Sequence, residues 1–470
     1  MLRLRAGFQE VRPFIADAWD LGWPMILIMF FHFAIGLTDV YVAGYLGTEV
    51  LAAVGYVGQL YFTLIILANA ITVGTVSMVS QAYGAGSSEG VGSITSHSVL
   101  AGLGFAGILT VVTGLFPGAL VRLAGMPSEI QEIARAFIQI FSLALIPSYL
   151  TIITGGILRA SDRVRITMRN AFVAAVINVF GDVVLAFGWG PIPELGYRGI
   201  AWASAGATTV GMILNLAHVF RGSGGFSIDV LFNPVFRCLK SLIKLGGPSA
   251  LQQVAWNTGT LVVYFLVGRL KEGEVTALAA MTGGLRIEAI IFLPIFALNM
   301  AAAVLTGNRL GVGDVSGARS GAKATALLSL LIIIGPAVAM FIYAPLLSRM
   351  LTDDPGVLFE MTRYLRINMA CMPFLAVGVA LGGALQGAGD TLATMRIIFT
   401  GMWLVRIPAI LISVHVLNLG ALGVWCCMTL SIIVLCILMM NRFLGDAWTT
   451  ASVDKKNNTM LWEACLKKPD

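Results

Sequence analysis

The chain has 470 residues, of which 58% are hydrophobic and only 11% are charged, and its formal net charge is +6. Because soluble domains carry roughly 25% charged residues, this composition excludes an ordinary water-soluble protein. The basic excess accompanies a mean hydropathy of +0.88, so it indicates the positive-inside bias of a membrane protein rather than a nucleic-acid-binding surface.

Apolar segments long enough to cross a hydrocarbon core of about 30 Å recur along the whole chain. The basic start, MLRLRAGFQEVRPFIADAWD, has no short apolar core with a small-residue cleavage site, so we expect a retained first helix and not a signal peptide. The sequence predicts an all-α polytopic membrane protein with twelve transmembrane helices. The predicted spans are 21–43, 52–78, 96–117, 137–158, 166–188, 199–220, 242–268, 275–305, 322–347, 364–386, 395–417 and 420–441.

Basic residues are distributed unevenly between the two sides of this topology. With both termini inside, the inner segments hold twenty of the thirty Lys and Arg residues and the outer loops hold eight. Arg286 and Arg406 lie within spans. Since cytoplasmic loops are enriched in Lys and Arg, we predict a multi-pass protein of the plasma (inner) membrane with both termini in the cytoplasm.

Blocks of the first half return in the second half at nearly constant spacing. The matched blocks are LGWPMIL at 21–27 with LGGPSAL at 245–251, QAYGAGSSEG at 81–90 with NRLGVGDVSG at 308–317, GGILRASDRVRITMRNAF at 155–172 with GGALQGAGDTLATMRIIF at 382–399, and GIAW at 199–202 with GVW at 423–425. Six spans per half is an even number, so the halves form a parallel repeat related by a pseudo-two-fold axis along the membrane normal. Transporters place their sites near the midplane of such repeats and rock one half against the other.

The repeat also predicts the domain organisation. Matched prolines, Pro24 with Pro248 and Pro147 with Pro373, interrupt helices in both halves and free backbone carbonyl groups. The expected parts are an N-terminal cytoplasmic segment (1–20), a first six-helix lobe (21–220), a cytoplasmic linker (221–241), a second six-helix lobe (242–441) and a cytoplasmic C-terminal tail (442–470).

The two halves differ in their intramembrane acids. Asp39 lies in AIGLTDVYVAGYLG, and Asn178 and Asp182 lie in INVFGDVVLAF. Their counterparts in the second half are apolar, near Val263, Val405 and Ala409. A charge at mid-bilayer costs about 2.5–3.5 kcal/mol on insertion scales, so these acids are expected to serve a function.

The acid pattern suggests coupling to an ion. Asn178 and Asp182 are four residues apart and share a helix face. Two neighbouring carboxylates in a low dielectric cannot both ionise without a large cost, which favours proton coupling. The same oxygens, with a hydroxyl such as Ser204, could instead hold Na⁺, so H⁺ and Na⁺ both stay open, as does a purely structural role. His32, two turns before Asp39, is either a proton relay or a packing residue.

Other polar and sulfur-containing residues lie within the spans. Arg286 and Glu288, in GGLRIEAIIFLPIF, are two apart and do not face each other, so they either join structural ion pairs or line a cavity. Arg406 is expected to extend toward the membrane surface. The cysteines show no metal-ligand spacing, and we interpret all six as small core residues. They are Cys238, Cys371, Cys426, Cys427, Cys436 and Cys465.

Taken in order, several motifs resemble those of the multidrug and toxic compound extrusion (MATE) family. They are GLTDVYVAGYLGTEVLAAVG at 36–55, GTVSMVSQAYGAG at 74–86, ILRASDRVR at 157–165, INVFGD at 177–182, GIAWAS at 199–204 and WLVRIP at 403–408. The resemblance covers about residues 20–440. It implies two six-helix lobes around a V-shaped central cavity, and export of amphipathic, often cationic compounds driven by inward H⁺ or Na⁺.

Position by position, the resemblance implies an ion-coupling site at Asp39, Asn178, Asp182 and Ser204. One branch of the family carries further acids in the second lobe, but Asn257 occupies the span-7 position and the segment 364–387 has no acid. The chain therefore resembles the DinF-like branch, and these positions lack the acids of a second-lobe Na⁺ site. His32, Asn257, Arg286 and Glu288 are candidates for a secondary polar cavity.

Two other functions share features with this sequence. A flippase for a lipid-linked sugar shares the two-lobe plan, but it needs several arginines for anionic phosphates, and Arg286 is the main candidate. An intramembrane aspartyl protease is suggested by GVGD at 311–314, which matches GAGS at 84–87 on an inner turn, so Asp314 is expected to be a solvated loop residue. No HExxH motif or phosphate loop occurs. We expect a monomeric non-enzyme without cofactors or nucleic-acid partners, and a polar tail with a short interfacial helix near Met460–Leu466.

Overall fold

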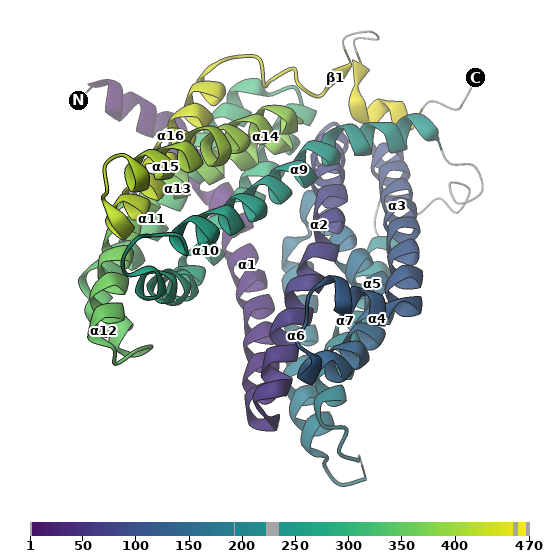
Figure 1. The fold of residues 1–470 in the computed structure, drawn as a ribbon. Helices are drawn as coiled ribbons and strands as arrows, with labels where there is room; N and C mark the ends of the chain where they lie inside the picture. Colours follow the sequence, from purple (N-terminus) through teal and green to yellow (C-terminus); the bar gives the residue numbers. More distant parts are fainter. Residues whose placement is uncertain (1, 192, 222–234, 455–458, 467–470) are drawn as a thin grey trace. The chain divides into compact units, whose positions relative to one another are not determined.

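The computed structural model describes residues 2–191, 193–221, 235–454 and 459–466, and almost all of them are helical (Figure 1). The long helices are α1 (Leu2–Leu46), α2 (Thr48–Gly84), α3 (Ser88–Leu115), α5 (Gln131–Ala160), α6 (Val164–Phe187), α7 (Tyr197–Phe220), α9 (Phe236–Val267), α10 (Glu274–Gly311), α11 (Val315–Ile342), α13 (Pro355–Gly387) and α16 (Gly420–Leu444). The shorter elements are α4 (Pro117–Leu123), η1 (Ser128–Ile130), α12 (Ala344–Arg349), α14 (Thr391–Phe399), η2 (Thr400–Arg406), α15 (Ile407–His415), β1 (Val453–Asp454), β2 (Thr459–Met460) and η3 (Leu461–Cys465).

Eleven helices of the described chain are long and apolar enough to cross a membrane. The helix at the seventh predicted span, α9, is 32 residues long but carries Gln252, Gln253 and Asn257 within its apolar stretch. With α9 included, helices occupy all twelve predicted positions. Helical backbone is the expected solution because each helix satisfies its own hydrogen bonds in lipid.

Two elements differ from the predicted spans. The basic N-terminal segment does not stand apart from the first span, because α1 runs without interruption from Leu2 to Leu46. The eleventh span is not one regular α-helix: α14 and α15 are joined by the π-helical turn Thr400–Arg406. π-helical turns are rare in proteins, and those that do occur are often found at functional sites.

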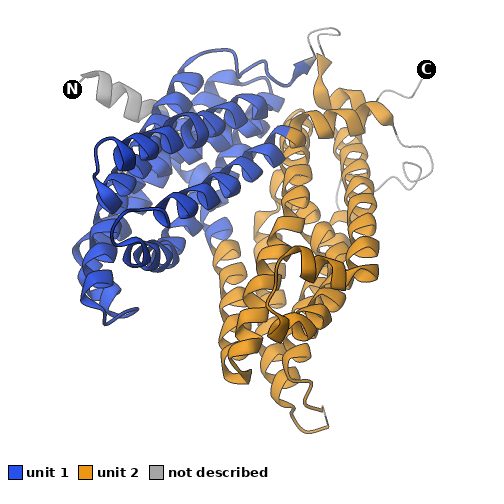
Figure 2. Ribbon diagram, in the orientation of Figure 1, with its two compact units in different colours: residues 1–26, 248–453 blue, residues 27–247, 454–470 orange. Residues whose placement is uncertain are grey.

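The chain folds as two compact units (Figure 2). Unit 1 comprises residues 1–26 and 248–453, and unit 2 comprises residues 27–247 and 454–470. Each unit contains a segment from the opposite sequence half: the start of α1 belongs to unit 1, and the start of α9 belongs to unit 2. Most of the linker expected at 221–241, including GSGG at 222–225, lies outside the described residues.

Close helix packing holds these exchanged segments in their units. In unit 1, a Cβ atom at Gly22 of α1 would lie 2.8 Å from the Leu298 side chain. In unit 2, a Cβ at Gly246 of α9 would lie 2.5 Å from the Ala70 carbonyl oxygen. Gly22 and Gly246 occupy equivalent places in the matched blocks LGWPMIL and LGGPSAL, so both halves use the same glycine for the same close approach.

The end of the chain corrects two predictions. Cys238 and Cys465 form a disulfide, so they are not free core residues. Cys426 is exposed and Cys427 is half-buried, whereas Cys371 and Cys436 are buried as expected. The segment predicted as an interfacial helix is a 3₁₀ helix, η3, and its Leu461, Trp462 and Cys465 side chains are buried in unit 2. The physical reason is that the tail folds back onto α2 and α3, beside the start of α9.

Candidate functional site

Three helices of unit 2 bring Asp39, Asn178 and Ser204 together. The Asn178 amide of α6 donates to Asp39 Oδ1 of α1 at 3.4 Å and to Ser204 Oγ of α7 at 3.0 Å. The Ser204 hydroxyl lies 3.2 and 3.1 Å from the two Asp39 carboxyl oxygens. Asn178 is completely buried, and Asp39 and Ser204 are half-buried. The predicted grouping of these three residues therefore exists in the structure.

Asp182 completes this acid cluster one helical turn beyond Asn178. Its side chain is completely buried and lies within electrostatic reach of Asp39. Among the described residues, neither Asp182 carboxyl oxygen nor Asn178 Oδ1 has a hydrogen-bond partner. Gly181 allows the close packing of α6 on α7 behind the acid, since a Cβ there would lie 3.0 Å from Ala203 Cβ.

This geometry leaves the acid cluster short of compensating positive charge. Among the described residues, the hydrogen-bond donors to Asp39 are a neutral amide and a neutral hydroxyl, and the Asp182 oxygens accept no hydrogen bond. Two ionised carboxylates so placed would be costly, and binding of one proton or one cation relieves that cost. No group of three or more His, Cys, Asp or Glu side chains within the described residues has metal-binding geometry, so a Na⁺ ion would depend on two carboxylates with amide and hydroxyl oxygens.

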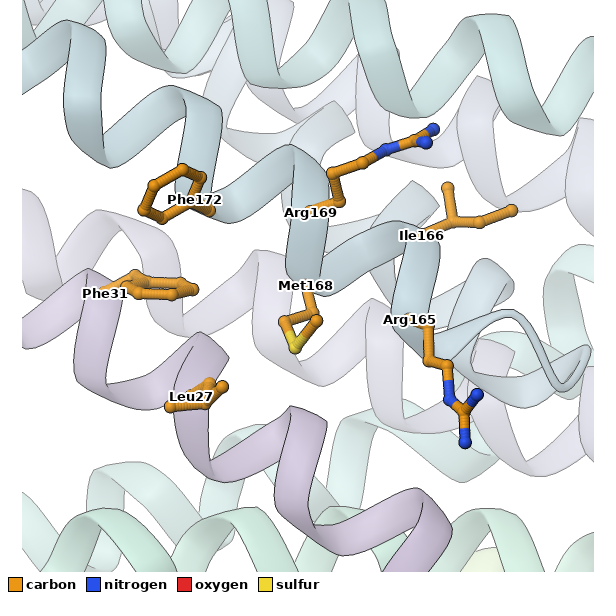
Figure 3. Close-up of a pocket in the computed structure, with 7 residues that line it drawn as sticks. All are labelled: Leu27, Phe31, Arg165, Ile166, Met168, Arg169 and Phe172. Carbon is orange, nitrogen blue, oxygen red and sulfur yellow. The ribbon is translucent and has the colours of Figure 1, made fainter.

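A cavity of about 530 Å³ lies in unit 2 between α1 and α6 (Figure 3). This volume is within the usual range of small-molecule sites, roughly 300–1,000 Å³. The Phe31 and Phe172 rings are 5.4 Å apart, and the guanidinium group of Arg169 lies 3.1 Å from the His218 ring. The lining residues are Leu27, Phe31, Arg165, Ile166, Met168, Arg169 and Phe172.

The cavity and the acid cluster share the same two helices. On α1, Phe31 precedes Asp39 by about two turns, and on α6, Phe172 precedes Asn178 by fewer than two turns. Sequence reasoning missed the cavity because an aromatic side chain facing a cavity and one facing the core have the same helical spacing. The one available signal was Arg165, whose counterpart in the repeat is Leu392.

A second buried polar cluster lies in unit 1. The Tyr364 hydroxyl of α13 donates to Glu288 Oε2 of α10 at 3.1 Å, while Glu288 Oε1 is buried without a partner in the described chain. Arg406 does not extend to the membrane surface as expected. It is 5% exposed and its Nε donates to Ser431 Oγ at 2.7 Å. Burial of Glu288 and Arg406 in one cluster offsets part of the cost of desolvating each charge.

The remaining predicted polar residues do not join that cluster. Arg286 is exposed, consistent with its position two residues from the buried Glu288. The Asn257 amide donates to the Gln253 carbonyl of its own helix at 2.9 Å. His32 is exposed and belongs to unit 2. The sequence also missed Glu360, which lies just before the predicted span and accepts from the Trp425 indole at 2.6 Å.

The chain is similar to a known protein family along most of its length. The MatE family model matches residues 24–184 and 248–412. A probable multidrug resistance protein NorM from Thermotoga maritima is 25% identical over 418 residues, which is 89% of each chain. Another from Rhizobium meliloti is 26% identical over 434 residues, or 90% of this chain and 91% of the relative.

Solved structures show the same fold. A MOP superfamily transporter from Pyrococcus furiosus, described as having a binding pocket of reverse polarity, superimposes with a TM-score of 0.85 at 21% identity, covering 93% of this chain and 97% of that one. A Vibrio cholerae MATE transporter in a bent form superimposes with a TM-score of 0.85 at 18% identity, again covering 93% and 97%. The predicted all-α membrane fold with twelve transmembrane helices in two lobes is confirmed by these similarities. Because the family model matches both halves of the chain, the protein belongs to the MatE family of multi-pass membrane transporters.

Proposed function

We propose that this protein is a secondary active multidrug efflux antiporter that exports small amphipathic, often cationic compounds in exchange for H⁺ or Na⁺. The observation that carries the proposal is the acid cluster of Asp39, Asn178, Asp182 and Ser204, in which the half-buried Asp39 and the buried Asp182 lack a cationic partner in the described contacts. The names of the NorM relatives support drug export. The DinF-like assignment, the inner-membrane location and the cytoplasmic termini are parts of the same proposal.

Coupling follows from competition for one compensating charge. In an outward-facing state, a proton or Na⁺ from outside binds the acid cluster and removes the negative charge that a cationic compound would neutralise. The compound then dissociates, the two lobes rock, and the ion leaves to the cytoplasm as new substrate binds. In this scheme the cavity beside Phe31 and Phe172 supplies adaptable aromatic contacts to the apolar part of a substrate.

The charge of the transported compounds needs a direct test, because the charged residues of that cavity are basic. Arg165 and Arg169 lie among its lining residues, and no acid does. A panel of cationic, neutral and anionic dyes of matched size should be offered to vesicles holding the purified protein. Imposing the pH gradient and the Na⁺ gradient separately identifies the coupling ion, because only that gradient should drive net dye movement. If net dye movement without either gradient equalled the movement with a gradient, secondary active transport would be contradicted.

Asp39→Asn tests the coupling site. The amide keeps the shape of the side chain and one acceptor oxygen but cannot exchange a proton, so gradient-driven efflux should fall to the level of empty vesicles. Yield, monodispersity and Tm should stay near those of the parent protein. Asp182→Asn should behave in the same way.

Asp314→Asn is the matched control, because it makes the same chemical change in a solvent-facing turn. Asp314 caps α11 by accepting a hydrogen bond from Gly317 N–H at 2.8 Å. Efflux by this variant should stay within about two-fold of the parent, since Asn caps a helix N-terminus about as well as Asp does. Full gradient-driven efflux by Asp39→Asn would remove the basis of the proposed coupling site.

A further inference from the structure

The end of the chain is anchored first in unit 1. Trp448 is completely buried there, its ring stacks on Phe443 at 5.3 Å, and its indole nitrogen donates to the Phe443 carbonyl at 2.8 Å. Arg319 of α11 lies over the Trp448 ring, 5.6 Å from its centroid, and forms an ion pair with Asp446. Residues up to Val453 belong to this unit.

A few residues later the same tail is anchored in unit 2. The η3 side chains Leu461, Trp462 and Cys465 are 6%, 7% and 3% exposed. Trp462 packs against the N-terminal turn of α3, where a Cβ at Gly90 would lie 2.8 Å from its ring. The Ser93 hydroxyl donates to the Cys465 carbonyl at 2.9 Å. We call this contact region, formed by Gly90, Ser93 and η3, the tail dock.

The same turn of α3 positions the partner cysteine. His97 Nδ1 lies 2.7 Å from the Ser93 carbonyl and so donates to it, which leaves His97 Nε2 to accept from Val235 N–H at 2.9 Å. Val235 directly precedes α9, and Cys238 in the first turn of α9 is completely buried. Ser93 and His97 therefore hold both cysteine-bearing segments, and the Cα atoms of Cys238 and Cys465 are 4.6 Å apart.

We propose that Cys238 and Cys465 are a reversible thiol–disulfide modification site that fastens the tail to unit 2 and slows transport when closed. Closing consumes one low-molecular-weight disulfide: a cysteine thiolate attacks it and releases one small thiol, and the second cysteine thiolate then attacks the mixed disulfide and releases the other. Two cysteine thiols are oxidised and one small disulfide is reduced to two thiols. Reopening is the same exchange in reverse.

Two features favour reversibility over a permanent structural bond. The sequence predicts that both cysteine segments face the cytoplasm, where disulfides are usually transient and redox-sensing. In the tail dock, η3 is a short element held by three buried side chains. Local opening of such elements costs much less free energy than global unfolding. After reduction, η3 is retained by noncovalent contacts, among them burial of these side chains and the Ser93 hydrogen bond.

The effect on transport rests on the proposed function. Because the tail is anchored in unit 1 at Trp448 and in unit 2 at Cys465, a closed disulfide makes the second anchor covalent. A closed disulfide then keeps the tail joined to both units throughout any cycle in which the units move relative to each other. Reduction turns that covalent anchor into one that can detach.

The first experiment detects the bond without measuring transport. Intact cells are treated with a thiol-alkylating reagent before lysis, with and without prior exposure to a membrane-permeant disulfide, and the purified protein is digested with trypsin. The sequence predicts one cross-linked species, Cys238–Lys240 joined to Asn457–Lys467. This peptide should be present after oxidant treatment, and its amount in untreated cells should be at least five-fold lower. Its absence after oxidant, or equal amounts in both samples, would overturn the proposal.

A glycine pair tests whether the tail dock guides the bond. Gly90→Val should displace Trp462 and lower the cross-linked peptide several-fold under the same oxidant. Gly104→Val is the matched control on α3, because nothing lies within 4 Å of a Cβ there, and it should leave the yield unchanged. Equal yields from both variants would show that the dock does not position the cysteines.

The second experiment measures dye efflux by oxidised and reduced protein in vesicles. Reductant should raise the initial rate of the parent at least two-fold and leave Cys238→Ser and Cys465→Ser, already at the higher rate, unchanged. Cys436→Ser, which removes a buried free cysteine, should respond like the parent. Equal rates for oxidised and reduced parent protein would overturn the regulatory role. If no variant transports any dye, the proposed function fails while the peptide experiment still decides the modification site.

Discussion

Single residues of the two halves differ in whether their role in the structure is kept by both halves or by one. Asp162 has a φ of 59°, and its counterpart Gly389 has a φ of 85°. The left-handed turn is thus kept by both halves, as glycine in one and as aspartate, which tolerates that region, in the other. The acid cluster follows the opposite rule, because only the first half keeps Asp39 and Asp182. A residue type kept at equivalent positions of both halves indicates a structural role. A site that the protein needs in one copy requires its residues in one half alone.

Ser204→Ala tests the acid cluster at this scale. The hydroxyl lies 3.2 and 3.1 Å from the two Asp39 oxygens, and hydrogen bonds to charged groups contribute about 1.5–3 kcal/mol. We expect the concentration of coupling ion giving half-maximal efflux to change by about ten-fold or more, while the fold is retained. Ser204→Thr, which keeps the hydroxyl, should preserve the parent value. Identical ion dependence for both variants would show that the hydroxyl does not act on Asp39.

The pH dependence of transport should not come from the surface turn. The hydrogen bond from Gly317 N–H lowers the pKa of Asp314. A lowered carboxyl pKa stabilises the fold above the ordinary value of about 3.9 and loses that effect as pH falls through the lowered value. Asp314→Asn should therefore leave the efflux-against-pH curve unshifted between about pH 5 and 8, measured in vesicles. A shifted curve would implicate this turn in coupling.

At the scale of elements, close glycine contacts decide how the helices of unit 1 pack. A Cβ at Gly383 of α13 would lie 2.0 Å from the Asn299 carbonyl oxygen of α10, and a Cβ at Gly387 would lie 2.0 Å from that of Ala303. Backbone atoms cannot move aside as a flexible side chain can, so these glycines bring α10 and α13 together. The Asn299 amide adds a hydrogen bond to the Val379 carbonyl at 2.7 Å.

Gly383→Ala should consequently destabilise the protein. The added methyl group meets backbone, and overpacking of this kind costs about 1–3 kcal/mol. A lower Tm should be seen by thermal unfolding in detergent. Gly104→Ala is the control, since its Cβ would meet nothing within 4 Å and alanine favours the helix; its Tm should be unchanged or slightly higher. An unchanged Tm for Gly383→Ala would mean that the two helices separate without cost.

For the whole molecule, the division of α1 and α9 between the units is the main finding. Unit 1 ends its first segment at Ile26, two residues after Pro24, and unit 2 ends its first segment at Gly247, directly before Pro248. Proline inside a helix removes one backbone hydrogen bond and bends the chain. The matched prolines therefore mark the places where a helix passes from one unit to the other, which is where relative motion of the units would bend it.

Pro24→Ala tests that role. Alanine restores the missing N–H and stiffens α1, so we expect slower efflux, by several-fold, with Tm unchanged or raised. Pro147→Ala is the matched control, because Pro147 lies in the interior of α5, entirely within unit 2. It should change efflux by less than two-fold. An equal effect of both substitutions on efflux would show that a proline at the unit boundary has no special role in transport.

The sequence by itself determined the membrane class, the twelve spans, the internal repeat and the residues of the acid cluster, because hydropathy, periodicity and the cost of intramembrane charge depend on local chemistry. Only the tertiary structure decided which segments exchange between units, that Arg406 is buried beside Glu288, that the cavity lies between α1 and α6, and that Cys238 meets Cys465. Each of these depends on contacts between residues far apart in the chain, and such contacts leave no period or spacing in the sequence.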